Sequence, residues 1–147
     1  MPTYSLKPQD VKRKWYLLDA KEVPLGRLAT AAARMLIGKD KSSFTPHIDG
    51  GDYVVIINAG AVVVTGGKPQ KKVYFRHSGY PGGLHKRSLT EQLERDSTKV
   101  ITKAVRGMLP VNKLRPGRLA RLKVYSGEQH PHEPQQPIKY GFKKDKT

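Results

Sequence analysis

The stretch Tyr53-Val54-Val55-Ile56-Ile57-Asn58 indicates the fold class of this 147-residue sequence. Its apolar residues follow one another without polar alternation, which is typical of a strand that is covered on both faces. Such strands belong to layered α/β folds rather than to sandwiches or helical bundles. We therefore predict an α/β domain built around this segment.

The chain before this strand predicts another strand and a helix. Residues 15–20 form a short aromatic and aliphatic run, which is typical of a strand. Helical spacing of apolar residues follows from Leu25, and Gly38 provides a C-terminal stop for that helix. The apolar positions of the predicted helix are Leu25, Leu28, Ala29, Ala32 and Leu36. The order strand, helix, strand supports the α/β prediction.

The chain after it divides into a domain and a tail. Residues 61–65 predict a further strand, and residues 123–125 predict a last one. Between them, residues 66–87 are rich in Gly, Pro and Lys and predict little regular structure. We assign residues 1–126 to a single α/β domain. Residues 127–147 form a basic tail rich in Pro, Gln and Lys, which we expect to be disordered or ordered on a partner.

Two helices are expected between these regions. Residues 88–91, Ser-Leu-Thr-Glu, match the capping box S-x-x-E, which predicts a short helix that ends at Arg95. A second amphipathic helix begins near Ser97, and Pro110 ends it because proline cannot continue a helix.

The charge of the chain is large and uneven. There are 28 Lys and Arg against 12 Asp and Glu, which gives a net charge of +16. Residues 1–60 carry 9 basic and 6 acidic side chains, whereas residues 61–147 carry 19 and 6. Such an excess is best tolerated when a polyanion neutralises it, so we predict nucleic acid as the partner.

The sequence argues against a membrane or secreted protein. Its apolar stretches are far shorter than the roughly 18 residues of a transmembrane helix, and it shows no lipidation motif or secretory signal. The absence of cysteine fits a reducing compartment. We expect a soluble, intracellular protein.

No motif predicts catalysis, a metal or a cofactor. Residues 65–68 place glycines beside a lysine but lack the spacing of a phosphate-binding P-loop. His130 and His132 are too few for a structural zinc site. Asp49 and Asp52 flank two glycines, where aspartates more often cap turns than catalyse. We therefore predict no enzyme, no cofactor and no small-molecule substrate.

Residues 74–87 are the strongest candidate for nucleic-acid binding. They interleave aromatic, basic and glycine residues, and such residues stack on unpaired RNA bases and contact phosphates. A solvated basic loop whose tyrosines pack on the core explains the same pattern equally well. A second basic block has the same two interpretations, and its spacing favours an irregular contact; it contains Lys113, Arg115, Arg118, Arg121 and Lys123.

Several blocks together resemble the family of bacterial large-subunit ribosomal protein thirteen (the "L thirteen" family). The resemblance covers essentially residues 3–137, and its most specific blocks are His77-Ser78-Gly79-Tyr80-Pro81-Gly82-Gly83 and Gly107-Met108-Leu109-Pro110. The other matching blocks are residues 15–20, 25–29, 51–59, 122–125 and 130–132.

The resemblance implies a structure, a location and partners. The fold would be a three-layer α/β/α arrangement with a small, mostly parallel sheet, basic loops and an extended C-terminal tail. The protein would be a structural constituent of the cytoplasmic large ribosomal subunit, would bind its ribosomal RNA beside neighbouring ribosomal proteins, and would support early assembly. Members of the family are also associated with binding messenger RNA to repress translation.

On this basis we expect one set of residues to face RNA and another to shape the first loop. The expected RNA-facing residues are Arg76, His77, Lys86, Arg87, Arg106, Lys113, Arg118, Arg121 and Lys123. Tyr80, Gly82 and Gly83 are expected to shape the loop that presents the first four. The sequence departs from the family at Asp40, where histidine is usual, and around Arg115-Pro116, which reshapes a turn.

Two other functions remain open at this point. The chain could be a free RNA-binding regulator that acts on messenger RNA outside the ribosome. It could also be an RNA-modifying enzyme, although the missing cofactor loop argues against that function.

Overall fold

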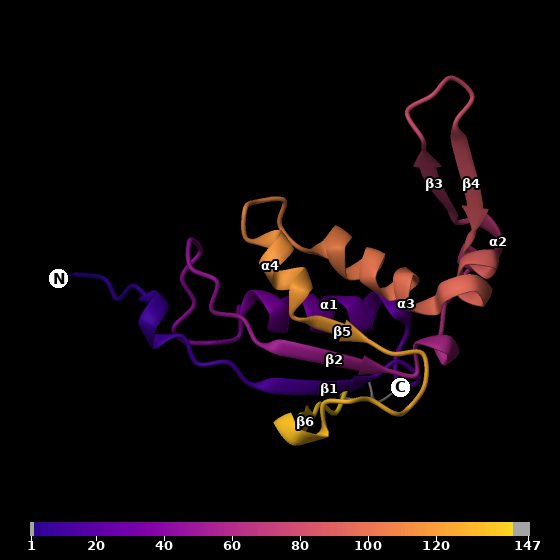
Figure 1. Cartoon of the computed structure of the whole chain (residues 1–147). Helices are drawn as coiled ribbons and strands as arrows, with labels where there is room; N and C mark the ends of the chain where they lie inside the picture. The colour runs from indigo at the N-terminus through magenta and orange to yellow at the C-terminus, as the bar shows by residue number, and fades with distance from the viewer. Residues whose placement is uncertain (1, 143–147) are drawn as a thin grey trace.

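A four-stranded sheet forms the centre of the molecule in the computed structural model, which describes residues 2–142 (Figure 1). Its strand order is β5-β2-β1-β6, and each neighbouring pair is parallel. The strands are β1 (Trp15–Asp19), β2 (Tyr53–Ile57), β5 (Leu122–Val124) and β6 (Ile138–Lys139). The predicted α/β fold with a small, mostly parallel sheet is confirmed.

Helix α1 (Leu25–Ile37) connects β1 to β2 and agrees with the predicted helix. Its apolar stripe is buried, and Leu28 and Leu36 are fully inaccessible. Gly38 ends the helix with φ +78°, and its N–H donates to the carbonyls of Arg34 and Met35. A side chain there would also approach the Gly50 carbonyl oxygen at 2.8 Å, so both backbone conformation and space require glycine.

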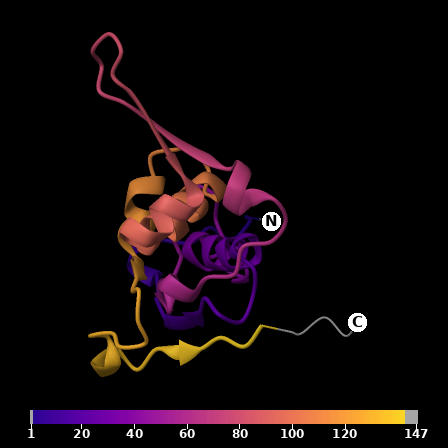
Figure 2. The same ribbon diagram turned by 90° about the vertical axis from the view of Figure 1, so that its right-hand side faces the viewer.

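Helix α3 (Leu89–Met108) lies beside α1 on the same face of the sheet (Figures 1 and 2). Val100, Ile101 and Val105 of α3 pack into one apolar core with α1 and with the inward side chains Val54 and Ile56 of β2. This burial stabilises the domain because it removes continuous apolar surface from water. The core therefore lies between the helices and one face of the sheet.

Both ends of α3 follow the local sequence. The Ser88 hydroxyl accepts the Glu91 N–H at 3.3 Å, and the Glu91 carboxylate accepts the Ser88 N–H at 3.2 Å, so the predicted capping box is present. Asp96 has extended backbone angles and kinks the helix between Arg95 and Ser97. The two predicted helices are thus the two arms of one kinked helix.

The C-terminal segment covers the opposite face of the sheet (Figure 2). The Trp15 ring stacks on Tyr53 with 4.3 Å between ring centroids, and His132 lies 5.0 Å from Trp15. The Tyr125 hydroxyl is hydrogen-bonded to His132 Nε2 at 2.6 Å. The short 3-10 helix η3 (Glu133–Gln135) follows, so this segment forms the thin third layer.

The tail is extended, as expected, and residues 138–140 of it pair with the edge strand of the chain's own sheet. β6 pairs with β1, and the Tyr140 N–H donates to the Leu17 carbonyl at 2.9 Å. The reason is that the edge of β1 offers unpaired backbone groups, which an added strand satisfies. Residues 143–147 of the predicted tail lie outside the described residues.

Two predictions between β2 and α3 are wrong. Residues 61–65 form no strand: the 3-10 helix η2 (Ala59–Ala61) precedes a single bridge between Val63 and Pro24. Residues 66–87 are regular instead of irregular, because they contain α2 (Lys68–Lys71) and the antiparallel hairpin of β3 (Val73–His77) and β4 (Leu84–Ser88). Most of the hairpin is exposed, so its sequence carries no burial pattern.

Two shorter elements complete the fold. A 3-10 helix, η1 (Pro8–Asp10), precedes the sheet, and α4 (Arg115–Ala120) follows α3. α4 lies where we expected an irregular basic segment; Pro116 falls in its first turn, where a missing N–H is tolerated. No helix in residues 2–142 is both long and apolar enough to cross a membrane.

Candidate nucleic-acid interface

The hairpin projects from one end of the domain, beyond the sheet (Figures 1 and 2). Its register pairs Tyr74 with Arg87 and Arg76 with His85, so these four side chains share one face. Alternation places their neighbours on the opposite face. The hairpin therefore presents two chemically different surfaces.

The tip of the hairpin is a tight glycine loop. The Ser78 N–H donates to the Gly83 carbonyl at 3.0 Å, and the Gly83 N–H donates to the Tyr80 carbonyl at 2.9 Å. A side chain at Gly83 would place its Cβ 1.9 Å from Ser78 Oγ, and Gly82 has φ +72°. Tyr80, Gly82 and Gly83 thus form the turn, while the Tyr80 ring itself is 76% exposed.

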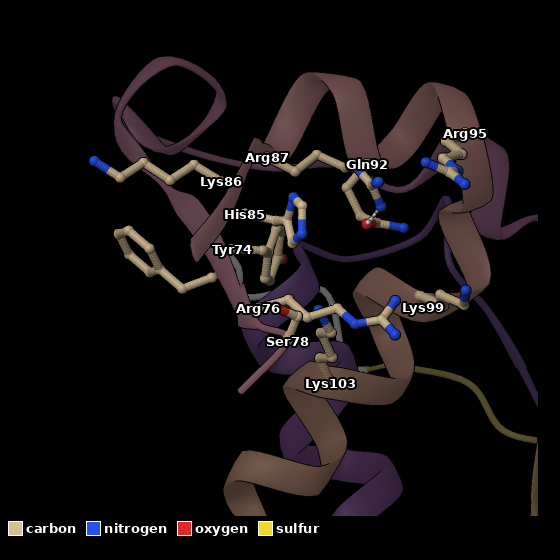
Figure 3. Close-up of a pocket in the computed structure, with 11 residues that line it drawn as sticks. Tyr74, Arg76, Ser78, His85, Lys86, Arg87, Gln92, Arg95, Lys99 and Lys103 are labelled. Atoms are coloured by element: carbon tan, nitrogen blue, oxygen red, sulfur yellow. Dashed lines mark hydrogen bonds between the residues drawn. The ribbon is translucent and has the colours of Figure 1, made fainter. Parts of the chain in front are cut away.

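A groove of about 630 Å³ separates the hairpin from α3 (Figure 3). Arg76 reaches from β3 toward the helix, and Lys99 and Lys103 stand on the helical side. The basic residues along the groove and its rim are Arg76, Lys86, Arg87, Arg95, Lys99 and Lys103. No carboxylate belongs to the described lining, which also contains Tyr74, Phe75, Ser78, His85 and Gln92. Six cations without a lining acid make a strongly positive concave surface.

Contacts inside the groove hold some of these side chains in place. Arg87 Nη1 donates to Gln92 Oε1 at 3.1 Å, and Gln92 is only 2% exposed. Lys103 Nζ lies 4.6 Å from the Tyr74 ring centroid, a cation–π distance. Burial raises the pKa of the Tyr74 hydroxyl above its ordinary value. The groove is therefore a preformed cationic surface rather than a set of independently moving side chains.

The predicted site residues lie at two ends of α3. Those of residues 76–87 occupy the hairpin, where the His77 ring accepts the Gly79 N–H at 2.9 Å through Nδ1. Arg106 and Lys113 are exposed, in the last turn of α3 and in the connection that follows. Lys123 is half-buried in β5. The fold does not bring this second group into the groove.

Sequence reasoning missed the helical wall of the groove. Lys99 and Lys103 are four residues apart in the arm of α3 that follows the kink, a spacing that keeps both side chains on one helical face, whereas Arg95 ends the arm before it. That spacing was a usable signal. Tyr74 and His85 belong to residues 74–87, which composition had already indicated. The hairpin register shows that both share the groove face with Arg76 and Arg87.

Arg118 and Arg121 depart from the expectation that they face RNA. Arg118 is 2% exposed and Arg121 7%, and both point toward Asp49. Arg121 Nη2 donates to Asp49 Oδ1 at 2.6 Å and to the Leu36 carbonyl at 2.7 Å. Arg13 Nη1 lies 4.0 Å from the same carboxylate. These residues form an internal cluster because a buried guanidinium requires a carboxylate and carbonyl acceptors.

The cluster carries more positive than negative charge. Burial alone would raise the pKa of the Asp49 carboxyl, but the hydrogen bonds and charge of Arg121 hold it below its ordinary value. Burial lowers the pKa of Arg118, whose Nε has no hydrogen-bond partner among the described residues. Asp49 is thus the carboxylate around which three arginines are arranged.

Fold and surface together define a class: a small basic α/β protein that presents a cationic groove beside a projecting hairpin. The family described as ribosomal protein L13 matches residues 13–131, and the chain belongs to that family. It is therefore a structural ribosomal protein and not an enzyme.

Similar proteins from actinobacteria cover nearly the full length. One from Kocuria rhizophila is 54% identical over 142 residues, which are 97% of each chain. One from Mycobacterium tuberculosis is 52% identical and one from Mycolicibacterium smegmatis 54% identical, each over 143 residues and 97% of each chain. All three carry the name large ribosomal subunit protein uL13.

Proposed function

We propose that this protein is a constituent of the large ribosomal subunit and that its hairpin groove binds ribosomal RNA. The observation that carries the proposal is the groove of six cationic side chains without a lining carboxylate. The names of the relatives support the same location, which in bacteria is the cytoplasm.

The mechanism is neutralisation of phosphates by a preformed surface. The two walls of the groove stand on different elements, β3–β4 and α3, so one backbone segment of RNA would contact both. Each phosphate that is paired releases condensed counterions, which supplies most of the sequence-independent affinity. Arg106 and Lys113 would add contacts at the far end of α3 and extend the interface. Such bridging would support early assembly of the subunit, because RNA segments repel each other until cations neutralise them.

A salt titration tests the groove. The variant K99A/K103A should bind a large-subunit RNA fragment more weakly, and its slope of log affinity against log salt should fall by about 1.4–1.8. The control K7A/K21A removes the same charge from exposed positions on the N-terminal side of the chain. If both variants change the slope equally, net charge rather than the groove binds the RNA.

A second measurement tests the location. The protein should remain with large subunits in a sucrose gradient after a high-salt wash, which removes proteins held only by counterion release. Release to the top of the gradient would favour a free RNA-binding regulator instead.

A further inference from the structure

The face of the hairpin that points away from the groove carries exposed apolar side chains. Register pairs Phe75 with Lys86 and His77 with Leu84 on this face, next to Val73. Phe75 is 63% exposed and Leu84 is 49% exposed. In Figure 3, Lys86 points away from the side chains that converge on α3. The face therefore turns outward from the groove, and Phe75 and Lys86 lie at the rim that the two surfaces share.

An aromatic ring in this position is not explained by folding. A two-stranded hairpin that projects from the domain has no core of its own in which Phe75 could be buried. Exposed apolar surface rimmed by polar groups marks interaction sites. Lys86 Nζ lies 5.9 Å from the Phe75 ring centroid, so a cation stands beside the exposed ring.

Charge decides between classes of partner. The sequence has no Asp or Glu between Asp52 and Glu91, so the hairpin and its flanks are uniformly cationic or neutral. The ligand that suits a ring beside an ammonium group combines a flat apolar face with a negative charge. An unpaired nucleotide has both, since its base stacks on aromatic rings and its phosphate pairs with lysine.

We propose that this outer face binds an unpaired nucleotide, whose base stacks on Phe75 while its phosphate contacts Lys86. The inference rests on the proposed function, because it names a second RNA feature for the same hairpin. The groove face contacts the phosphates of the RNA backbone, and the outer face binds one unpaired, unstacked base. The hairpin then lies between two RNA segments.

Binding of short oligonucleotides tests the stack. We compare an oligoadenylate with an abasic strand of the same length, which keeps the phosphates but has no bases. Phe75→Leu should weaken oligoadenylate binding between about 5-fold and about 150-fold, the range for loss of one stacked base. It should leave binding of the abasic strand unchanged. Phe75→Trp should retain affinity, and its added fluorescence should be quenched by oligoadenylate beyond the change seen for wild type with Trp15 alone.

Tyr4→Leu is the matched control, since Tyr4 is 67% exposed and lies outside the hairpin. Equal losses in Tyr4→Leu and Phe75→Leu, or equal losses on both strands, would overturn the proposal. So would a Phe75→Leu variant that binds RNA normally but no longer binds a neighbouring ribosomal protein. A salt slope in K99A/K103A equal to that of the wild type would refute RNA binding by the groove. It would not contradict the proposed stacking of a base on Phe75.

Discussion

Replacing Asp49 with Asn should destabilise the domain by about 3 kcal/mol. The change keeps the shape of the side chain but removes the one carboxylate charge that lies within 4.0 Å of Arg118 and Arg121 among residues 2–142; their side chains are 2% and 8% exposed. Removing one partner of a buried ion pair costs about 3–5 kcal/mol, because the other charge stays buried without compensation. Asp49 itself is 17% exposed, which places the cost at the lower end of that range.

Urea unfolding followed by fluorescence measures this cost. Trp15 is the single tryptophan of the chain and stacks on Tyr53 in the sheet, so its emission reports on the folded domain. With a slope of about 2 kcal/mol per molar urea, the midpoint should fall by about 1.5 M. Asp40→Asn is the control: Asp40 pairs with Arg34 at 2.6 Å, but both side chains are more than half exposed. An exposed pair contributes about 0–1 kcal/mol. Equal midpoint shifts in the two variants would refute the argument from burial.

The same variant predicts a pH dependence. The pKa of Asp49 in the folded state is held below its ordinary value by Arg121, against the opposing effect of burial. The stabilisation is therefore fully present above the unfolded pKa of about 3.9 and is lost as pH falls through the lower folded pKa. The difference in unfolding free energy between wild type and Asp49→Asn should be constant from about pH 5 to 8 and shrink below about pH 4. A difference that grows on acidification would contradict the assignment.

Three further changes separate stability from binding. Ser88→Ala should lower the unfolding free energy by about 1 kcal/mol in urea, because it removes the N-terminal cap of α3; an unchanged midpoint would mean that the cap is replaced by water. Gly83→Val should weaken RNA binding in a titration without shifting the urea midpoint, because its side chain collides with Ser78 Oγ in a hairpin that projects from the core. Arg121→Ala should lower the unfolding free energy by about 3 kcal/mol while leaving the salt slope of RNA binding intact. A lower slope with a normal urea midpoint would show that Arg121 faces RNA after all.

The buried elements were predictable because their patterns are local. The continuous apolar run of β2 and the helical spacing and glycine stop of α1 each depend on residues within one element. The capping box of α3 is likewise complete within four residues. The strand predicted from apolar content at residues 61–65 fails, since among the described residues this segment makes only a single bridge, between Val63 and Pro24.

The candidate site was less predictable for the opposite reason. Residues 74–87 were found by composition, but their hairpin was not, because exposed strands show no alternation of burial. The role of Arg118 and Arg121 depends on Asp49, which is more than sixty residues away in sequence. From the sequence, five basic residues in one block look equivalent. Their separation into buried and exposed members follows from the position of one carboxylate.

By itself, then, the sequence determined the fold class and the boundaries of α1 and α3, and it predicts an anionic partner, since these follow from local periodicity, caps and composition. The tertiary structure alone decided which cations stay at the surface, because that depends on which carboxylates and carbonyls lie beside them after folding. It also decided that α3 supplies the second wall of the groove and that the tail pairs with β1. Both are contacts between distant segments, whose partners no local pattern specifies.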